Sequence, residues 1–420
     1  MILSALRENG RAFGALLALS VLLFLITVAT YSSLGVLLPG MVKEMGWSWS
    51  EAGLGFTLLG FACGASSWLP RLLIRRFGVQ TTLVIGTLVM CGGLIGLGFC
   101  RNLPTYFISA TACGVGYQMM ALIPGSHVIA GLFQNRTRAL GFYFAAASIG
   151  GISGPPLVLG LMRLTGWREV WFVETGLSVA IGVFCAVVIG RLSLPKDSAA
   201  AQAKQAEVRG TGWTLAEAAR TPQFWVLVAA YFGHLLAGVT IVSVSIAHLT
   251  ERGVDIALAT FILSFESVMG LTGRMGAGLL GDRVNPKHLL LFALTVNALG
   301  CFALAVAGSD ITLFIYAIGA GLGFGLTAVA VTVLLLDYFG KEHNLEIFST
   351  VCLAGAVSAL GPVIAGVIRD NTGSFSPAFQ FFGLAIAAIG VAALFMRPPA
   401  HRSQRVAEPP VIASSKLSPS

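Results

Sequence analysis

Residues 265–283 read FESVMGLTGRMGAGLLGDR, an apolar and glycine-rich run that keeps two ionisable residues, Glu266 and Arg274, ahead of its first hydrophilic turn. The rest of the chain shares this composition. Of its 420 residues, 56% are apolar and only 10% are charged, and the mean hydropathy is +0.85. Soluble domains carry roughly 25% charged residues. The composition therefore indicates a membrane protein, built from spans of about 20 apolar residues.

Twelve apolar stretches of helical length follow one another along the chain, so the sequence predicts an all-α integral membrane protein with twelve transmembrane helices. The predicted spans are 13–41, 51–74, 79–100, 104–132, 140–162, 171–190, 223–249, 256–281, 288–307, 311–336, 346–368 and 376–396. The first span is too long for the core of a signal peptide, and we therefore expect a retained helix.

Lysine and arginine are distributed unevenly between the connections. If both termini face the cytoplasm, 19 of the 26 basic residues fall on the inner side and 6 on the outer side. The positive-inside rule then predicts a multi-pass protein with both termini cytoplasmic. We attribute the net charge of +8 to the positive-inside topology and not to a surface that binds nucleic acid. Arg274, inside a predicted helix, is the one basic residue that this topology does not explain.

The chain is expected to divide into five parts. These are an N-terminal cytoplasmic segment (1–12), a first six-helix bundle (13–190), a cytoplasmic linker (191–222), a second six-helix bundle (223–396) and a cytoplasmic tail (397–420). The tail contains prolines and serines and few large apolar residues, so we expect disorder there.

An offset of 207 residues aligns the two predicted bundles without gaps. The matched stretches are CGVG (113–116) with AGLG (320–323), GPPL (154–157) with GPVI (361–364), RLTGW (163–167) with DNTGS (370–374), and IRRFG (74–78) with GDRVN (281–285). Two parallel, pseudo-symmetric six-helix bundles are typical of a transporter with its substrate site between the halves. The glycine–proline stretches predict close helix approach and bends in the fifth and eleventh helices.

The connection after the eighth predicted helix, GAGLLGDRVNPKH (276–288), resembles the G-x-x-x-D-R-x-x-x-[RK] loop motif of the major facilitator superfamily. The residues that match the motif are Gly278, Asp282, Arg283 and Lys287. The resemblance implies the major facilitator fold and a gating role, in which these residues tie the inner ends of neighbouring helices together in one state. The first copy, RLLIRRFGVQ (71–80), has arginines at the Gly and Asp positions, so a topology signal explains it.

Several longer stretches are similar to bacterial carboxylate carriers, the monocarboxylate transporters and the oxalate:formate branch of that superfamily. They include PGMVKEMGWSWSEAG (39–53), FQNRTRALGFYFAAASIGG (133–151), GLTGRMGAGLLGDR (270–283) and RDNTGSFSPAF (369–379). The resemblance covers nearly all of residues 13–396. It implies a small carboxylate and a proton as partners, a lipid bilayer of the bacterial inner membrane as surroundings, and function as a monomer.

In that family an arginine within a Gly-Arg pair of helix 8 binds the substrate carboxylate, and the pair here is Gly273–Arg274. A guanidinium is always charged and can donate two parallel hydrogen bonds to a carboxylate. Arg274 precedes Asp282 by about 12 Å of helix. We therefore expect it near the bilayer midplane, where retained charges usually line a water-filled cavity. The structural alternative is an arginine that pairs with an acid or with carbonyls and locks helices together.

The proton acceptor is less clearly marked. Glu266 is separated from Arg274 by about 12 Å of rise and about 80° of rotation, which makes a direct pair poor. Animal relatives carry an aspartate four residues before the arginine, where this chain has Gly270. The candidates for proton coupling are Glu266, because burial favours a protonated carboxyl group, and His248, which matches a family position at the outer end of helix 7. Further options are His127 and His234.

The wall opposite the arginine is expected to come from helices 1, 4, 7 and 10. Tyr117 and its repeat mate Phe324 are predicted to pack against the alkyl part of the substrate, with Tyr31 and Ser32 as further lining residues. Helix 11 lacks the lysine of dicarboxylate carriers, and a single fixed cation suits a single carboxylate. The pattern therefore favours a monoanion.

Together these features predict a secondary active transporter that moves a lactate- or pyruvate-like monocarboxylate with a proton by alternating access. An anion exchanger of the oxalate:formate type, a drug:proton antiporter and a non-transporting membrane sensor are the alternatives. No H-E-x-x-H or G-x-S-x-G motif occurs, so an enzyme is not expected. The seven cysteines form no C-x-x-C pair, and neither a metal nor a cofactor is expected.

Overall fold

The computed structural model describes residues 2–133, 136–191, 213–280, 284–340 and 343–399. Every element of secondary structure within these residues is a helix. Most of the predicted linker and most of the predicted tail, residues 192–212 and 400–420, lie outside the described residues.

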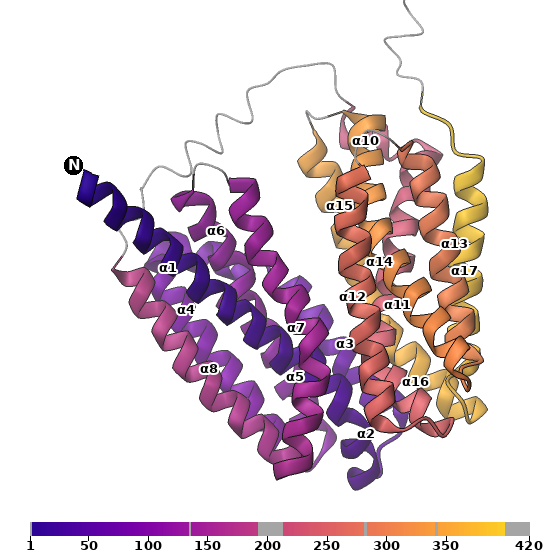
Figure 1. Ribbon diagram of the computed structural model, residues 1–420, viewed down its shortest axis with the longest axis horizontal. Helices are drawn as coiled ribbons and strands as arrows, with labels where there is room; N and C mark the ends of the chain where they lie inside the picture. The colour runs from indigo at the N-terminus through magenta and orange to yellow at the C-terminus, as the bar shows by residue number, and fades with distance from the viewer. Residues whose placement is uncertain (1, 134–135, 192–212, 281–283, 341–342, 400–420) are drawn as a thin grey trace, which may run out of the picture.

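One group of helices in Figure 1, coloured indigo to magenta, contains every element before residue 191. Its elements are α1 (Ile2–Thr27), the π-helix η1 (Val28–Ser32), α2 (Ser33–Met45), α3 (Trp49–Ala65), α4 (Trp68–Gly98), α5 (Leu103–Tyr117), the π-helix η2 (Gln118–Leu122), α6 (Ile123–Leu132), α7 (Arg136–Thr165) and α8 (Trp167–Gly190). The first three run on as one membrane-length segment, Gly10–Met45.

The second group, coloured red to yellow, contains the remaining described elements. They are α10 (Leu215–Ala218), α11 (Pro222–Glu251), α12 (Ile256–Leu280), α13 (Pro286–Ala305), α14 (Asp310–Phe339), α15 (Asn344–Ala356), the 3₁₀-helix η4 (Val357–Leu360), α16 (Gly361–Thr372) and α17 (Ser376–Leu394). The predicted bend in the eleventh helix is present, because η4 interrupts the helix just before Pro362. The fifth helix, α7, runs as a single element with Pro155 and Pro156 inside it.

Eleven segments of the described chain are long and apolar enough to cross a membrane, one fewer than predicted. The predicted span 51–74 is divided, because α3 has only 17 residues and the chain turns at Ser66 and Ser67 before α4 begins. α4 is itself broken at Gly78, whose φ of 84° is a conformation that glycine adopts readily and other residues rarely do. The second predicted helix is therefore α3 plus the first part of α4, and the third is the rest of α4.

The structure confirms the repeat, because residues 207 positions apart make equivalent helix contacts. Glycines of α5 and their mates in α14 lie against equivalent backbone positions: Gly114 on Leu59, Gly321 on Glu266, Gly116 on Met90, and Gly323 on Asn297. A Cβ atom at any of these glycines would overlap the backbone of the facing helix. Small residues are what permit such close helix approach.

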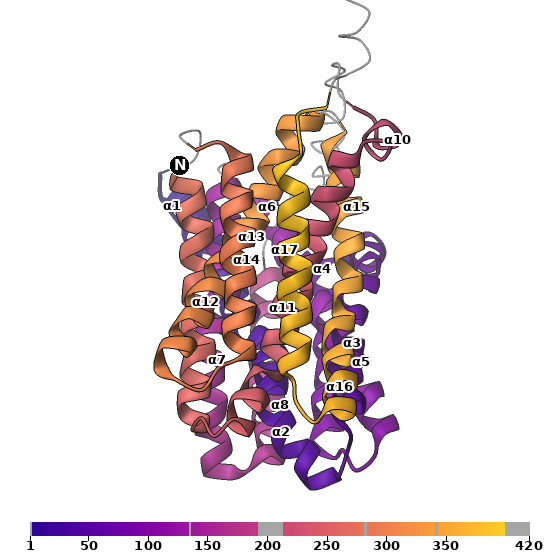
Figure 2. The ribbon, with the colours of Figure 1, turned by 90° about the vertical axis from the view of Figure 1, so that its right-hand side faces the viewer.

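The two groups of helices converge at the end where α2, α3 and α16 lie, and diverge toward the end that carries the N-terminus, α6, α10 and α15 (Figure 1). Figure 2 gives the view at right angles, in which α3 and α16 again lie side by side. The groups also meet where α2 contacts α11 and where α7 contacts α12. At the converging end, the carboxylate of Asp370 on α16 accepts hydrogen bonds from the backbone N–H groups of Trp49 (3.0 Å) and Ser50 (2.8 Å) at the start of α3.

Candidate functional site

Arg274 is exposed although it lies inside the membrane-length segment Ile256–Ala277 of α12. The face of α12 that carries it points toward the N-terminal group of helices. Ser267 precedes Arg274 by seven residues, which places the two side chains on the same face. The Ser267 hydroxyl lies 3.7 Å from the position that a Cβ atom would take on Gly151 of α7.

Close glycine packing holds the backbone at Arg274 against α14. A Cβ atom on Gly273 would lie 2.9 Å from the Leu322 carbonyl oxygen, and one on Gly325 would lie 3.0 Å from the Arg274 nitrogen. A larger residue at either position would push α12 away from α14. The glycine of the Gly-Arg pair therefore positions the arginine.

Aromatic rings form the floor beneath the guanidinium. The Arg274 Cζ atom lies 5.2 Å from the ring centroid of Phe324 on α14, within the range of a cation–π interaction. Phe324 packs against His234 of α11, with ring centroids 5.1 Å apart, and His234 packs against Tyr231 at 5.0 Å. Tyr231 continues the floor to Phe348 of α15, 6.2 Å away.

Arg274 has no ion pair and no hydrogen bond within the described residues; its guanidinium lies over the Phe324 ring and within electrostatic range of Glu266 and Tyr231. The two ion pairs found in that part of the chain, Arg168–Glu44 and Arg369–Glu251, lie at helix ends. The guanidinium therefore has unused hydrogen-bond donors within the described part of the chain.

Tyr117 and Tyr31 lie together in the N-terminal group. Their rings meet edge to face with centroids 5.6 Å apart, and the Tyr117 hydroxyl lies 3.4 Å from the Thr27 hydroxyl. Thr27 and Tyr117 are the repeat mates of His234 and Phe324, so both halves build the same contact. Ser32 is not part of this group. It is buried, and its hydroxyl donates to the Gly150 carbonyl of α7 at 3.5 Å.

Glu266 is buried and turned into the interior of the C-terminal group. Its carboxylate accepts a hydrogen bond of 3.4 Å from the neighbouring Ser267 hydroxyl. The groups within electrostatic range of it include Arg274, Cys301 and Tyr316. Glu266 therefore lies near enough to feel the charge of Arg274, but the two make no direct ion pair within the described residues.

His248 also lies away from the arginine. Its Nε2 atom is 2.8 Å from the Leu304 carbonyl oxygen, and its ring packs against Phe379. It follows His234 on α11 by about 21 Å of helix. His248 is thus a buried group at the converging end of the molecule.

The predicted loop motif is only partly within the described residues. Asp282 and Arg283 lie outside them, and Gly278 lies in the last turns of α12. The Lys287 ammonium group donates to the carbonyl oxygens of Leu394 (2.8 Å) and Met396 (2.6 Å). It therefore joins the start of α13 to the end of α17 within the C-terminal group.

Two polar residues near these features escaped the sequence reasoning. Tyr231 precedes His234 by three residues on α11. Side chains at this spacing are neighbours on a helix, so the sequence could have predicted their contact. Glu174 of α8 is buried inside the N-terminal group. Its spacing from Trp171 and Ser178 would have placed all three on one face of the helix.

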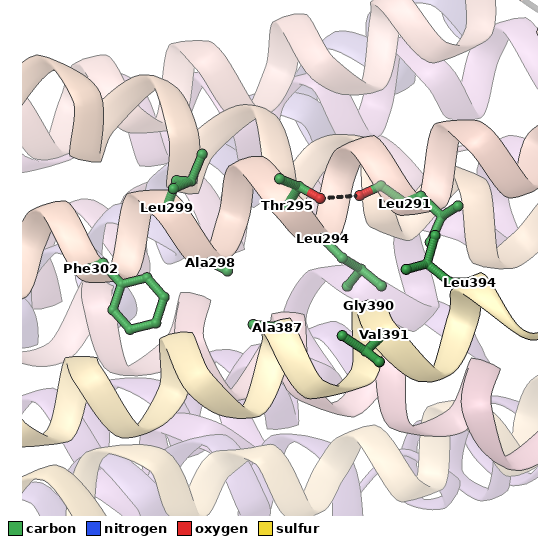
Figure 3. Close-up of a pocket in the computed structure, with 10 residues that line it drawn as sticks. All are labelled: Leu291, Leu294, Thr295, Ala298, Leu299, Phe302, Ala387, Gly390, Val391 and Leu394. Carbon is green, nitrogen blue, oxygen red and sulfur yellow. Dashed lines mark hydrogen bonds between the residues drawn. The ribbon is translucent and has the colours of Figure 1, made fainter.

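A groove of about 320 Å³ between α13 and α17 is shown in Figure 3. Its lining is apolar apart from Thr295, whose hydroxyl donates to the Leu291 carbonyl at 2.8 Å. Several of the lining side chains, among them Leu299 and Leu394, are exposed on the outer surface. The groove offers no group that could bind an anion and is not a candidate substrate site.

Comparison with known proteins agrees with this architecture. A family model described as Major Facilitator Superfamily matches residues 19–351 and 236–418. The chain is 23% identical over 396 residues to monocarboxylate transporter 13 of Rattus norvegicus, a match that covers 91% of this chain and 85% of that protein. It is 23% identical over 283 residues to the oxalate:formate antiporter of Oxalobacter formigenes, covering 64% of this chain and 66% of that protein.

The crystal structure of the nucleoside transporter NupG superposes with a TM-score of 0.70 at 14% identity, over 90% of this chain and 99% of that one. A likeness at this identity shows a shared fold. The helical architecture, the internal repeat and the family match lead to one conclusion. This chain is a multi-pass integral membrane protein that belongs to the major facilitator superfamily.

Proposed function

We propose that this protein is a secondary active transporter for small monocarboxylates of the lactate or pyruvate type, and that Arg274 binds the substrate carboxylate. The observation that carries the proposal is an exposed guanidinium inside a membrane-length helix, with no ion pair to any residue that the structure describes. Holding a charge there costs at least ~2.5–3.5 kcal/mol, and such charges usually serve a water-filled pathway. The monocarboxylate transporter relative supports the same substrate class.

The arrangement of the helices suits alternating access. With both termini cytoplasmic in a bacterial inner membrane, the diverging end of the molecule in Figure 1 is the inner side. In this conformation the site is open to that side, and the substrate would have its carboxylate on Arg274 and its alkyl group among Phe324, Tyr117 and Tyr31. Rocking of the two bundles about this position would then expose it to the other side.

A proton is proposed to move together with the anion. The fixed positive charge of Arg274 balances the substrate carboxylate within the site, and the proton is then the ion whose gradient drives accumulation. Exchange of one anion for another, as the name of the oxalate:formate relative describes, is the second candidate. The two differ in what drives net movement. Symport lets a proton gradient accumulate the anion, whereas exchange requires an anion on the opposite side.

Uptake of radiolabelled lactate into proteoliposomes tests the proposal. We expect uptake to rise when the outside is made acidic, and to be abolished in Arg274→Ala because the carboxylate loses its charged partner. Arg101→Ala is the matched control, since Arg101 is exposed in the connection between α4 and α5. Uptake by Arg274→Ala equal to that of the wild type would refute the site. Uptake that needs an internal anion and ignores the gradient would favour exchange, and binding without any flux would favour a sensor.

A further inference from the structure

A buried acid in the N-terminal group lies against the π-helical part of the first span. Glu174 of α8 is only 4% exposed. One of its carboxyl oxygens, Oε1, makes a hydrogen bond with the hydroxyl of Ser33, the residue that follows η1. The other, Oε2, is buried without a hydrogen-bond partner among the described residues.

Counting hydrogens at Ser33 assigns the protonation state of this acid. The Ser33 hydroxyl lies 2.9 Å from the Val28 carbonyl oxygen as well as against Glu174 Oε1. A serine hydroxyl has one hydrogen to donate, and a carbonyl oxygen can only accept. If that hydrogen goes to Val28, the hydrogen in the second bond must come from Glu174. Each bond then has a hydrogen of its own when Glu174 is a neutral carboxylic acid, whereas a carboxylate would have to share the single Ser33 hydrogen with Val28.

Among the residues that the structure describes, no cation pairs with Glu174 and stabilises its ionised form. The Cys113 thiol of α5 lies within electrostatic range of Glu174, and the Cys91 thiol of α4 lies 3.9 Å from the carbonyl oxygen of the next residue, Thr175. On α8 itself, Arg168 is about 9 Å further along the axis and pairs with Glu44 at 2.9 Å.

On α2 the nearest charged residue is Lys43, about 15 Å along the helix from Ser33. Arg163 of α7 is exposed in the last turn of that helix, and Arg76 of α4 lies beyond the break at Gly78. Burying an unpaired carboxylate is far more costly than burying the neutral acid. The position therefore suits a group that carries its proton.

The π-helix links this acid to the candidate substrate site. π-turns inside α-helices are frequently found at functional sites. The Ser33 hydroxyl bonds back to Val28 across the turn, and the turn itself carries Tyr31, whose ring meets Tyr117. A change at Glu174 would act on Ser33, then on η1, and so on the wall proposed to face the substrate.

We propose that Glu174 is a proton-binding site of this carrier, neutral in the present conformation and ionised when the first span moves. On release, the carboxylic acid gives its proton to water and becomes a carboxylate. The Ser33 hydroxyl then turns from Val28 to donate to that carboxylate, while Val28 keeps its bond from the Ser33 backbone N–H. The transport role of this site rests on the proposed function, but the protonation state of the acid does not.

Infrared spectroscopy of the full-length protein in lipid nanodiscs tests the protonation state without any substrate. We expect the carbonyl stretch of a protonated carboxyl group at neutral pH, and its loss from that band in Glu174→Gln. Glu169→Gln is the matched control, because Glu169 is exposed in the first turn of the same helix. In Ser33→Ala the band should shift, since the acid loses its acceptor. A band that is unchanged in Glu174→Gln would overturn the proposal.

Transport tests the coupling. A pH gradient of one unit drives up to about tenfold accumulation of a substrate that moves with one proton. Glu174→Gln should show no accumulation above the external concentration, whereas Glu169→Gln should accumulate like the wild type. Accumulation by Glu174→Gln equal to the wild type would overturn the coupling role. If the wild type itself does not move lactate, the proposed function fails while the infrared result still decides the state of Glu174.

Discussion

Arg274 combines three properties at the scale of a single residue: a permanent charge, exposure inside a membrane-length helix, and a guanidinium with unused donors in the described part of the chain. The ring of Phe324 lies beneath it, and Gly273 fixes its backbone against α14. These contacts orient the guanidinium without neutralising it. A carboxylate ligand would supply the missing acceptors.

The geometry of the guanidinium makes a specific prediction for Arg274→Lys. A lysine keeps the charge but donates as a point and not as a planar fork, so one of the two hydrogen bonds to the carboxylate is lost. Hydrogen bonds to charged groups contribute about 1.5–3 kcal/mol, and we therefore expect the KM for lactate uptake to rise at least about tenfold. The concentration dependence of uptake in proteoliposomes measures this. An unchanged KM, with Arg101→Lys as control, would argue against bidentate binding.

At the scale of the helices, the converging ends of the two groups are joined by hydrogen bonds between an aspartate of one group and the first residues of a helix in the other. Asp370 of α16 accepts the N–H groups of Trp49 and Ser50, which begin α3 and would otherwise lack partners. A carboxylate in this position stabilises a helix N-terminus by about 0.3–1 kcal/mol. Since the two helices belong to different groups, the same bonds favour the conformation in which these ends are closed.

We therefore predict that Asp370→Ala shifts the protein toward a conformation with these ends apart, by up to about fivefold in the ratio of conformers. Electron–electron distance measurements between spin labels at Lys43 and Asn371, in a cysteine-free background, would report a longer population. Asp310→Ala serves as control, because Asp310 begins α14 and caps no helix of the other group. A distance distribution that does not change would show that Asp370 contributes nothing to closure.

Most of the helical framework was predictable because hydropathy and the 207-residue offset are properties of the sequence alone. The contacts of Gly114 and Gly321 at equivalent positions confirm the offset. The division of the second span was not predictable. It depends on the turn at Ser66–Ser67 and on the backbone conformation at Gly78, both inside an apolar stretch. The π-turn η1 was not predicted either, because a π-turn inside a helix leaves no signal in the hydrophobic periodicity of the sequence.

The candidate site was only partly predictable from the sequence. Arg274 stood out because the topology left its charge unexplained. The offset paired Tyr117 with Phe324, and the two contact the repeat mates Thr27 and His234, while their place in a substrate site stays a prediction. Glu174 has no charged repeat mate, because Phe381 stands at the matching position. Which way a lone acid faces depends on the packing of neighbouring helices, and that information is absent from one sequence.

At the scale of the whole molecule, the proposed carrier places a fixed cation on one bundle, an aromatic wall on the other and a buried acid behind that wall. The two groups touch at one end and diverge at the other (Figure 1). This arrangement would let the substrate bridge the bundles while the proton is held within one of them. The central claim is that the bridge is a carboxylate bound to Arg274.

Equilibrium binding of radiolabelled lactate to the purified protein in nanodiscs tests that claim most directly, with unlabelled lactamide as a neutral competitor of the same shape. We predict that the wild type binds lactate, that lactamide competes at least about tenfold more weakly than lactate, and that Arg274→Ala loses at least about tenfold in affinity. Wild-type affinity in Arg274→Ala, or equal competition by lactamide, would contradict carboxylate recognition by this arginine.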